Sequence, residues 1–540
     1  MSNKPTPTQS NSPTQKEHIV AYLEIMDCEN KMQNPQDSDL LLAQLAWIYN
    51  DVMKWPGRVK AGGHPDIEVK IFSNNVVIAM EEGDNDQYPT NCYSVAKFCI
   101  GFQTMALTYG LFLHGAVTVG KFASGKLQPE EKDNQSFFVY GEALVKAYSL
   151  TNENTTLPCV IIDNCIFKNA SPEELLRNET LAEMYLRRED GKYFLNPFRI
   201  LKSLKKDFQD RSLNILQEIR EMLLSEYAKT LIDKSISSEK HYFSLTLFNR
   251  FCIKHKEYEH LQIPVEIFDR PCVTPNKPRA ELKTILDKRP PQSFVPPQQA
   301  EYIVAHLDFL GAAKKMRVTG ESDKFLWQID TIYSAALEMK KRLAKLGLNK
   351  IETKIFSDNI IIAKKTNNPQ CSISEFIEVQ TFCRMFQTYA LIFGAIVRGA
   401  ITQGKFFMDN TFAYGEALCK AYNLEAKAAV YPRIIVDPAM FSGIKIDDLN
   451  LEGLKRDQDG LYFLDNFDFL EKHFSDKEFP VVFEKTRATI IAEYKKILNL
   501  QKLDLIAKYH WLANQFNEYC YANNHPFSIN LDKLTLEGVK

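Results

Sequence analysis

The chain has 540 residues, of which 45% are hydrophobic and 25% are charged, and its formal net charge is −2. This composition is typical of a globular protein, and at roughly 150 residues per domain the length suggests about two to four domains. The small net charge, without a marked block of Lys or Arg, gives no reason to expect electrostatic binding to nucleic acid or to a membrane surface.

The N-terminal residues, MSNKPTPTQSNSPTQK, are rich in Ser, Thr, Pro, Asn and Gln and contain no apolar stretch. They predict a disordered tail over 1–16 rather than a signal peptide. The most apolar window starts at Phe98 and is interrupted by Gln103, Tyr109 and His114, which favours a buried helix and strand over a membrane span. Eleven Cys residues without CxxC pairs indicate reduced core thiols and a cytoplasmic location.

The rest of the chain contains a tandem repeat. HIVAYLEI, GAVTVGKF and FVYGEALVKAY of the first repeat align with YIVAHLDF, GAITQGKF and FAYGEALCKAY of the second, with one insertion in the first repeat around ASGKLQPEEK. A register held over so many elements indicates a duplicated domain. We predict one domain with a helical tail over 17–262 and another over 300–540. The Pro-rich linker between them, 263–299, is long enough for the two domains to pair within one chain.

Each repeat shows the same order of periodic segments. In the second repeat they are a strand (IVAHLDF), a helix (DKFLWQIDTIYSAALEMKKRLAKLG), a hairpin (ETKIFSDNIIIAKK), a helix (SEFIEVQTFCRMFQTYALIFG), two strands (AIVRGAITQG and TFAYG), a helix (EALCKAYNLEAKAA) and a strand (RIIVD). This βαββαβ order, with an extra strand and helix, predicts an α+β fold of the ferredoxin-like kind, with helices on one face of the sheet. A helical extension follows each sheet.

Two aspartates of the second repeat fall where they can converge. Asp308 lies near the end of the first strand, and Asp358 lies in the turn of the hairpin that neighbours this strand in a ferredoxin-like sheet. A carboxylate in an apolar strand is costly unless it is paired or binds a cation, whereas an Asp in a hairpin turn also commonly caps the turn backbone. Hard oxygen ligands in this arrangement suit Mg²⁺ or Mn²⁺ bound together with a triphosphate.

The first repeat carries Glu24 and Asn74 at the two corresponding positions. Asn supplies no negative charge and Glu is one methylene longer than Asp, so even with Asp27 nearby we expect weak metal binding or none. Because the strand, hairpin and helix patterns are retained, a folding or partner role for the first repeat is favoured over neutral drift.

The segments IVAHLDFLG, FSDNIIIA, VRGAITQG and YGEALCKAYNLEAKAAVYPRIIVD resemble the catalytic domain of class III nucleotide cyclases, in the bacterial branch that includes the pyrimidine cyclases of Pycsar antiphage defence. The resemblance covers His18 to Asp163 and Tyr302 to Asp437. It implies two cyclase domains paired head to tail, here as a pseudo-heterodimer, with one domain holding two Mn²⁺ or Mg²⁺ ions. Its metal ligands would be Asp308 and Asp358, with the backbone carbonyl of Phe309 as a further ligand.

The reaction implied by this resemblance starts from a nucleoside triphosphate. The ribose 3′ oxygen attacks the α-phosphate and pyrophosphate leaves, with the metal ions activating the hydroxyl and neutralising charge on the triphosphate. The product is a 3′,5′-cyclic nucleotide second messenger, and the antiphage branch also implies a separate effector protein that responds to it.

The sequence departs from the family at the transition-state positions. Purine-specific members use an Asn and an Arg there, whereas this chain has Val145 and Ser149 in the first repeat and Cys419 and Asn423 in the second. Lys146 would reach a nucleotide bound at the two aspartates if the domains pair head to tail, and a solvated helix lysine is the alternative. Arg398, at a strand start, is either structural or directed at a phosphate.

The positions that recognise the base also differ. The Lys and Asp of purine cyclases are replaced by Glu68 and Phe138 in the first repeat and by Glu352 and Phe412 in the second. Their absence favours a pyrimidine triphosphate, UTP or CTP, and an atypical purine site is the alternative. Two alternatives stay open: a noncatalytic nucleotide-binding or scaffolding protein, and a homodimer that pairs two second repeats.

Overall fold

A computed structural model describes most of the chain. The described residues are 14–53, 67–126, 137–153, 156–168, 184–199, 201, 209–232, 239–263, 297–318, 320–342, 351–366, 373–441, 446 and 451–538. The predicted disordered tail (1–16) and Pro-rich linker (263–299) fall almost wholly outside them. Across these ranges, no helix is both long and apolar enough to cross a membrane.

The chain forms two compact bodies. The N-terminal body consists of Lys16–Phe122 and Glu142–Gln298, and the C-terminal body consists of Met1–Gln15, Ala123–Gly141 and Gln299–Lys540. Ala123–Gly141 is therefore a segment of the first repeat that belongs to the C-terminal body. Within that body its strand β5 (Phe137–Tyr140) runs parallel to β10 (Glu352–Phe356), and the Ser357 N–H donates to the Val139 carbonyl at 2.7 Å.

A mixed sheet forms the centre of the C-terminal body. Its strands β9 (Ala300–Phe309), β10, β11 (Asn359–Lys365) and β12 (Val397–Met408) lie in the order β12-β9-β11-β10, each antiparallel to its neighbour. Strand β14 (Ile434–Val436) adds to this sheet parallel to β12. The order confirms the βαββαβ arrangement predicted for the second repeat.

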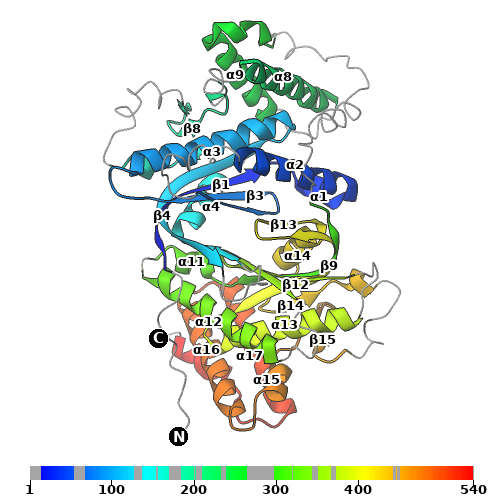
Figure 1. The fold of residues 1–540 in the computed structure, drawn as a ribbon. Helices are drawn as coiled ribbons and strands as arrows, with labels where there is room; N and C mark the ends of the chain where they lie inside the picture. Colours follow the sequence, from blue (N-terminus) through cyan, green and yellow to red (C-terminus); the bar gives the residue numbers. More distant parts are fainter. Residues whose placement is uncertain are drawn as a thin grey trace. The chain divides into compact units, whose positions relative to one another are not determined.

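Helices cover both faces of this sheet (Figure 1). Because side chains alternate along β9, Phe309 faces α12 (Glu321–Arg342) and α13 (Ile373–Ile392), where its ring lies 5.7 Å from Phe325 and 6.0 Å from Phe386. His306 faces the other way, and its ring lies 5.5 Å from that of Tyr422 on α14 (Glu416–Lys427). The prediction that helices cover only one face is therefore wrong. The apolar pattern of a buried strand does not show on which face each helix packs.

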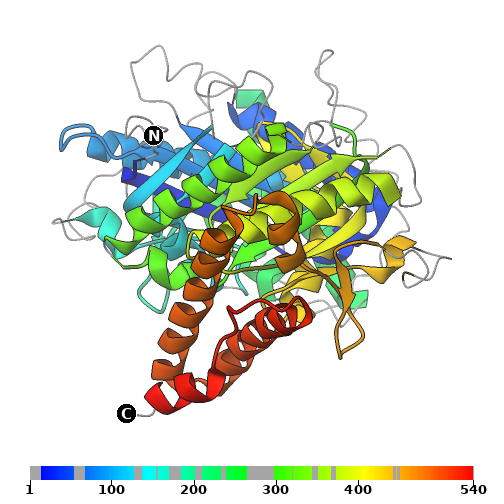
Figure 2. The ribbon, with the colours of Figure 1, turned by 90° about the horizontal axis from the view of Figure 1, so that it is seen from below.

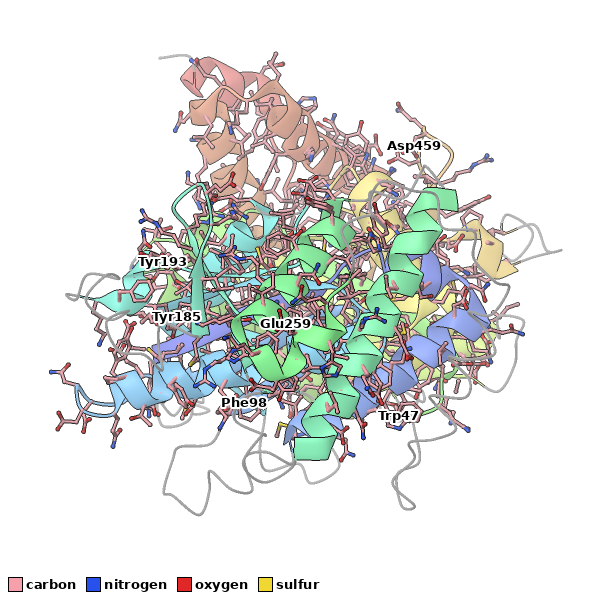
Figure 3. All side chains as sticks on the ribbon, turned by 90° about the horizontal axis from the view of Figure 1, so that it is seen from above. Trp47, Phe98, Tyr185, Tyr193, Glu259 and Asp459 are labelled. Atoms are coloured by element: carbon pink, nitrogen blue, oxygen red, sulfur yellow. The ribbon has the colours of Figure 1, made fainter. Side chains whose placement is uncertain are left out.

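The N-terminal body has the same topology. Strands β1 (Lys16–Ile25), β2 (Glu68–Phe72), β3 (Asn75–Glu81) and β4 (Leu113–Lys126, in this body as far as Phe122) follow the order β4-β1-β3-β2, and β6 (Val160–Ile162) is parallel to β4. Its core helices are α2 (Pro35–Met53), α3 (Tyr88–Thr108) and α4 (Glu142–Asn152). In the predicted helical extension, α8 (Gln209–Ile232) packs against α3 and against α9 (Glu239–Lys254), and Figure 3 looks down on this layer.

The remaining elements are shorter or lie in the C-terminal extension. In the N-terminal body they are α1 (Glu29–Gln33), η3 (Asn164–Phe167), β7 (Tyr185–Arg187), β8 (Tyr193–Leu195) and η4 (Lys256–Leu261). In the C-terminal body they are α11 (Ala312–Met316), β13 (Phe412–Tyr414), η8 (Pro438–Phe441), β15 (Leu454–Arg456), β16 (Tyr462–Leu464), α15 (Phe467–His473), α16 (Phe479–Leu500), α17 (Leu503–Ala522) and α18 (Leu531–Gly538). Figure 2 shows α16 and α17, which pack against each other.

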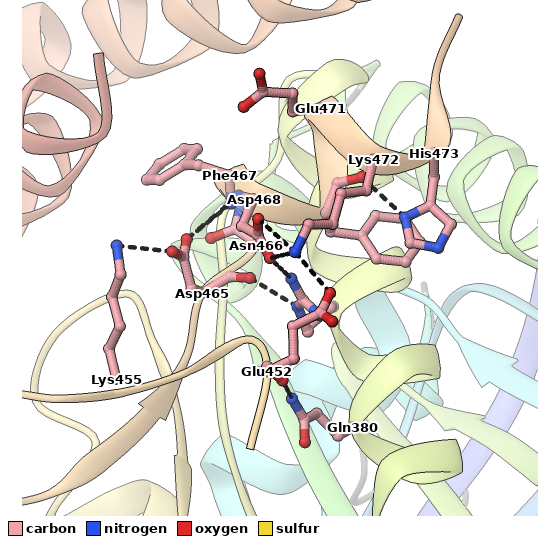
Figure 4. A network of polar contacts seen from close by, with 12 residues as sticks. Gln380, Glu452, Lys455, Asp465, Asn466, Phe467, Asp468, Glu471, Lys472 and His473 are labelled. Atoms are coloured by element: carbon pink, nitrogen blue, oxygen red, sulfur yellow. Dashed lines mark hydrogen bonds and ion pairs between the residues drawn. The ribbon is translucent and has the colours of Figure 1, made fainter. Parts of the chain in front are cut away.

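A polar network on α13 anchors the segment that leads into this extension (Figure 4). Arg384 is buried, and its Nε donates to the Asp465 carbonyl at 2.7 Å while its Nη2 donates to Asp468 Oδ2 at 2.9 Å. Lys472 Nζ links Asp468, at 3.2 Å, to Glu452, at 2.7 Å. The start of the extension is therefore held to the core helix by charged contacts as well as by apolar packing.

A second anchor holds α17 to the β15–β16 turn. Arg433 has only 1% of its surface exposed and forms ion pairs with Asp457 and Asp459 of the turn. Trp511 of α17 donates its Nε1–H to Asp457 Oδ2 at 3.0 Å, and its ring stacks on Tyr431 with centroids 5.4 Å apart. Helix α17, the turn and the strand edge therefore meet at one buried guanidinium.

In the first repeat, the positions aligned with Arg433 and Asp457 place the positive charge in the turn and none next to the strand. Cys159 stands where Arg433 stands in the second repeat, and Arg188 of the turn stands where Asp457 stands. Arg188 pairs with Asp190, two residues away in the same turn. The ion pair is thus kept within the turn in one body, whereas in the other it joins the turn to the strand.

Replacing Arg433 tests the second anchor. We expect Arg433→Met to lower the free energy of unfolding of the C-terminal body by about 3–5 kcal/mol, because the Asp457 side chain, 9% exposed, would lose its cationic partner and keep only the Trp511 N–H. Urea denaturation followed by tryptophan fluorescence measures the change. The matched control is Arg342→Met, which removes an exposed pair with Glu338 and should cost less than about 1 kcal/mol. Equal losses in the two variants would contradict the assignment.

Candidate functional site

Asp308 and Asp358 meet at the end of β9. In the register of β9 with β11, Asp308 lies opposite Asn359, the residue after Asp358. The Phe309 N–H donates to the Asp358 carbonyl at 3.1 Å, and Ser357 adopts a positive φ of 58° in the hairpin turn. The strand end and the turn are thereby held together, and both carboxylates are placed in one region of the sheet.

Arg398 and Glu425 complete this region. Arg398 lies opposite Asp308 in the register of β12 with β9, and its Nε donates to Asp308 Oδ2 at 3.2 Å. Its Nη2 lies 2.6 Å from Glu425 Oε1. Glu425 projects from the buried face of α14, where its side chain is 3% exposed. The guanidinium therefore links a strand carboxylate to a helix carboxylate.

Burial raises the pKa values of the three carboxylates, and neighbouring negative charge raises those of Asp308 and Glu425 further. Burial, followed by the charges of Asp358 and Glu425, raises the pKa of Asp308 to about 8. Burial also raises the pKa of Asp358 and that of Glu425. Burial and the nearby Arg398 lower the pKa of His306 to about 4, so this imidazole is neutral at pH 7. Arg398 therefore contacts two of the three acids, Asp308 and Glu425, and negative groups outnumber the guanidinium at this place.

This charge pattern fits a divalent cation. Mg²⁺ is commonly bound by one or two carboxylates together with substrate phosphates, rather than by a cage made only of protein ligands. Over the ranges that the structure describes, no group of three or more His, Cys, Asp or Glu side chains is arranged to hold a metal ion. Asp308 and Asp358 thus suit an ion that completes its ligand shell with oxygens from a phosphate-bearing substrate.

The corresponding place in the N-terminal body has one carboxylate. Asn74 Nδ2 donates to Glu24 Oε1 at 3.2 Å, and His114 Nε2 lies 3.5 Å from Glu24 Oε2. Thr151, aligned with Glu425, donates its hydroxyl to the backbone of its own helix. Asp27 forms an ion pair with Lys240. These contacts favour the expectation of little or no metal binding in this body, which stays a prediction.

The other predicted residues fall in both bodies. Arg398 lies in the C-terminal body, as do the two aspartates and Phe309. Phe138 is a buried residue of β5 in the same body, opposite Ile355 of β10. Glu68 is exposed at the start of β2 in the N-terminal body. Lys146 also belongs to that body, where its Nζ lies 2.7 Å from Asp163 Oδ2 and 3.4 Å from Cys165 Sγ. It is held by an ion pair rather than only by solvent.

Sequence reasoning missed Glu425. The helix EALCKAYNLEAK does contain a signal for it. Leu418, Ala421 and Glu425 fall on one face of this helix, so Glu425 is an acidic residue within an otherwise apolar stripe. Lys354 was missed as well. This lysine is fully buried, and its Nζ donates to the carbonyl of Phe412 at 2.8 Å. Glu352, at the position aligned with the base-recognition Lys, lies two residues earlier on the same strand.

The raised pKa of Asp308 predicts how the stability of the protein depends on pH. Because this pKa lies above the value of about 3.9 expected in an unfolded chain, ionising Asp308 costs more in the folded state. The free energy of unfolding should therefore fall as the pH rises from about 4 to about 8. Mn²⁺ should raise the melting temperature more at pH 8 than at pH 6. Both effects should shrink in Asp308→Asn, measured by calorimetry, and an identical pH profile for wild type and variant would contradict the assignment.

Comparisons with known proteins leave the family open. No protein-family model and no curated protein matches the sequence. Among solved structures, the chain is similar to a class III adenylyl cyclase-like ATP-binding protein from Pseudomonas aeruginosa, with a TM-score of 0.44 and 10% sequence identity over 85% of this chain and 90% of that chain. Similarity at this level establishes neither a shared fold nor a shared activity.

Proposed function

We propose that this protein is a nucleotide cyclase that converts a nucleoside triphosphate to a 3′,5′-cyclic nucleotide and pyrophosphate at the site of Asp308 and Asp358. The observation that carries the proposal is the convergence of these two carboxylates, from a strand end and a hairpin turn, in a buried region with excess negative charge. Sites that bind Mg²⁺ or Mn²⁺ with a triphosphate need this combination of hard oxygen ligands and negative charge.

The residues of the C-terminal body would hold the reactants. Two Mn²⁺ or Mg²⁺ ions bound by Asp308, Asp358 and the Phe309 carbonyl would lower the pKa of the ribose 3′ hydroxyl and neutralise charge on the triphosphate. The rigid pairing of β9 with the hairpin keeps the two carboxylates in place. The 3′ hydroxyl would lose its proton to solvent and its oxygen would attack the α-phosphorus, while the bond from this phosphorus to the bridging oxygen breaks and pyrophosphate leaves with that electron pair.

The N-terminal body would serve as the partner domain in a pseudo-heterodimer. Its shared topology and its single carboxylate at the aligned place support this division of labour. In this arrangement Lys146 would leave Asp163 to contact the nucleotide. Pairing of two chains through their C-terminal bodies is the alternative arrangement, which would give two sites in a homodimer.

The finer parts of the proposal rest on the resemblance of the sequence motifs. Glu68 and Phe138, in place of the purine-recognition pair, favour UTP or CTP as the substrate. The resemblance to the Pycsar branch extends the proposal to a cytoplasmic role in antiphage defence, with a cyclic-nucleotide-responsive effector as partner.

A noncatalytic nucleotide-binding or scaffolding role is the second candidate. The observation that favours it is the lack of the usual Asn and Arg at the transition-state positions, which carry Val145 and Ser149 in one repeat and Cys419 and Asn423 in the other. Such a protein would bind a nucleotide without turning it over.

An activity assay with matched variants separates the two candidates. Full-length protein is incubated with Mn²⁺ and each of the four nucleoside triphosphates, and cyclic products are measured by mass spectrometry. We expect product from UTP or CTP. We expect a loss of about 100-fold or more in Asp308→Asn or Asp358→Asn, because metal ions supply several kcal/mol of transition-state stabilisation.

The aligned residues of the first repeat provide the controls. Glu24→Gln and Asn74→Ala should retain activity within about threefold if the N-terminal body holds no catalytic metal. A folded wild-type protein that yields no cyclic product from any triphosphate would refute the cyclase proposal. Nucleotide binding retained in that sample would then favour the scaffolding role.

A further inference from the structure

Arg398 is shared between two carboxylates that lie on different elements. Its Nε contacts Asp308 Oδ2 on β9 at 3.2 Å, and its Nη2 contacts Glu425 Oε1 on α14 at 2.6 Å. Its Nη1 also donates to the carbonyl of Ala429, just beyond α14, at 3.5 Å. Two of the three guanidinium contacts are thus on the helix side, and only one is to Asp308.

The first repeat lacks the whole arrangement. His114 aligns with Arg398 and Thr151 aligns with Glu425, while Glu24 and Asn74 replace the two aspartates. Glu24 receives its contacts from Asn74 and His114 instead. The arginine and the helix carboxylate therefore occur in the body that has two adjacent aspartates, which indicates that all four residues serve one site.

Charge explains why an arginine would stand next to a cation site. When no metal is present, the Arg398 guanidinium lies within contact distance of both Asp308 and Glu425 and offsets part of their negative charge. A divalent ion on Asp308 would place a second cation against the same carboxylate, and like charges at contact distance in a buried region repel strongly. Glu425 is 3% exposed, and burying a carboxylate is costly unless it is paired, as it is here with Arg398.

We propose that Arg398 is an exchangeable counter-ion: it pairs with Asp308 and Glu425 in the metal-free protein, and it leaves Asp308 but stays with Glu425 when a divalent ion binds. The inference rests on the metal site of the proposed function. Glu425 is then a positioning residue that acts through Arg398 and is not a metal ligand. The exchange allows the carboxylates to remain buried without metal, and it sets the affinity for the ion through competition.

A double-mutant cycle on Mn²⁺ affinity tests the exchange. Free Mn²⁺ is titrated into the full-length protein and bound ion is followed by electron paramagnetic resonance, without nucleotide. Arg398→Gln should tighten binding about tenfold because it removes the competitor, and Glu425→Gln should weaken it about tenfold because Arg398 then pairs only with Asp308. In the Arg398→Gln background, Glu425→Gln should change the affinity by less than about threefold.

The cycle separates indirect from direct action of Glu425. If Glu425→Gln weakens Mn²⁺ binding equally in both backgrounds, Glu425 is a ligand or a distant charge, and the exchange is wrong. Lys405→Gln serves as the charge control. Lys405 lies on the same strand as Arg398, but its ammonium group pairs with Glu301 rather than with Asp308. It should leave the affinity unchanged.

A second measurement does not depend on the variants folding. Crystal structures of the wild-type protein with and without Mn²⁺ should show the Arg398–Asp308 contact only in the metal-free form and the Arg398–Glu425 contact in both. An unchanged Arg398–Asp308 contact beside bound Mn²⁺ would overturn the exchange while the metal site stands. A wild-type protein that binds no Mn²⁺ would refute both the exchange and the proposed metal site.

Discussion

The closeness of two partly buried carboxylates, Asp308 and Asp358, is the constraint that the candidate site of the C-terminal body has to satisfy. The pairing of β9 with the β10–β11 hairpin places Asp308 and Asp358 together, and the pKa of Asp308 rises to about 8 as a result of burial and nearby negative charge. Folding would not favour such a pair for its own sake, because burying like charges is unfavourable. The cost is understandable if the site exists to bind a cation, and Arg398 limits that cost while the cation is absent.

The N-terminal body shows that the same strand order forms without two neighbouring carboxylates at this place. There Asn74 donates to Glu24 at the equivalent place, so an amide and a carboxylate replace two carboxylates and a hydrogen bond replaces repulsion. Two copies of one topology thus differ in electrostatics while they share strand order. Duplication allows this difference, since one copy can keep two neighbouring carboxylates while the other satisfies its polar groups internally.

Packing around the sheet connects the site to distant parts of the chain. Ala123–Gly141 comes from the first repeat, yet β5 pairs with β10, and the Val139 carbonyl accepts the N–H of Ser357, the residue before Asp358. Helix α14 supplies Glu425 from the face opposite α12 and α13. The geometry at Asp308 and Asp358 therefore depends on a segment of the other repeat as well as on the hairpin itself.

The sequence by itself determined the tandem repeat, the βαββαβ order and the two aspartates as candidates, because periodicity and a carboxylate in an apolar strand are local signals. It did not reveal that α14 covers the second face, that Glu425 joins Asp308 through Arg398, or that Ala123–Gly141 belongs to the C-terminal body. Only the tertiary structure decided these points. Each depends on contacts between residues far apart in the chain, and an apolar stripe shows that a face is buried without showing what it is buried against.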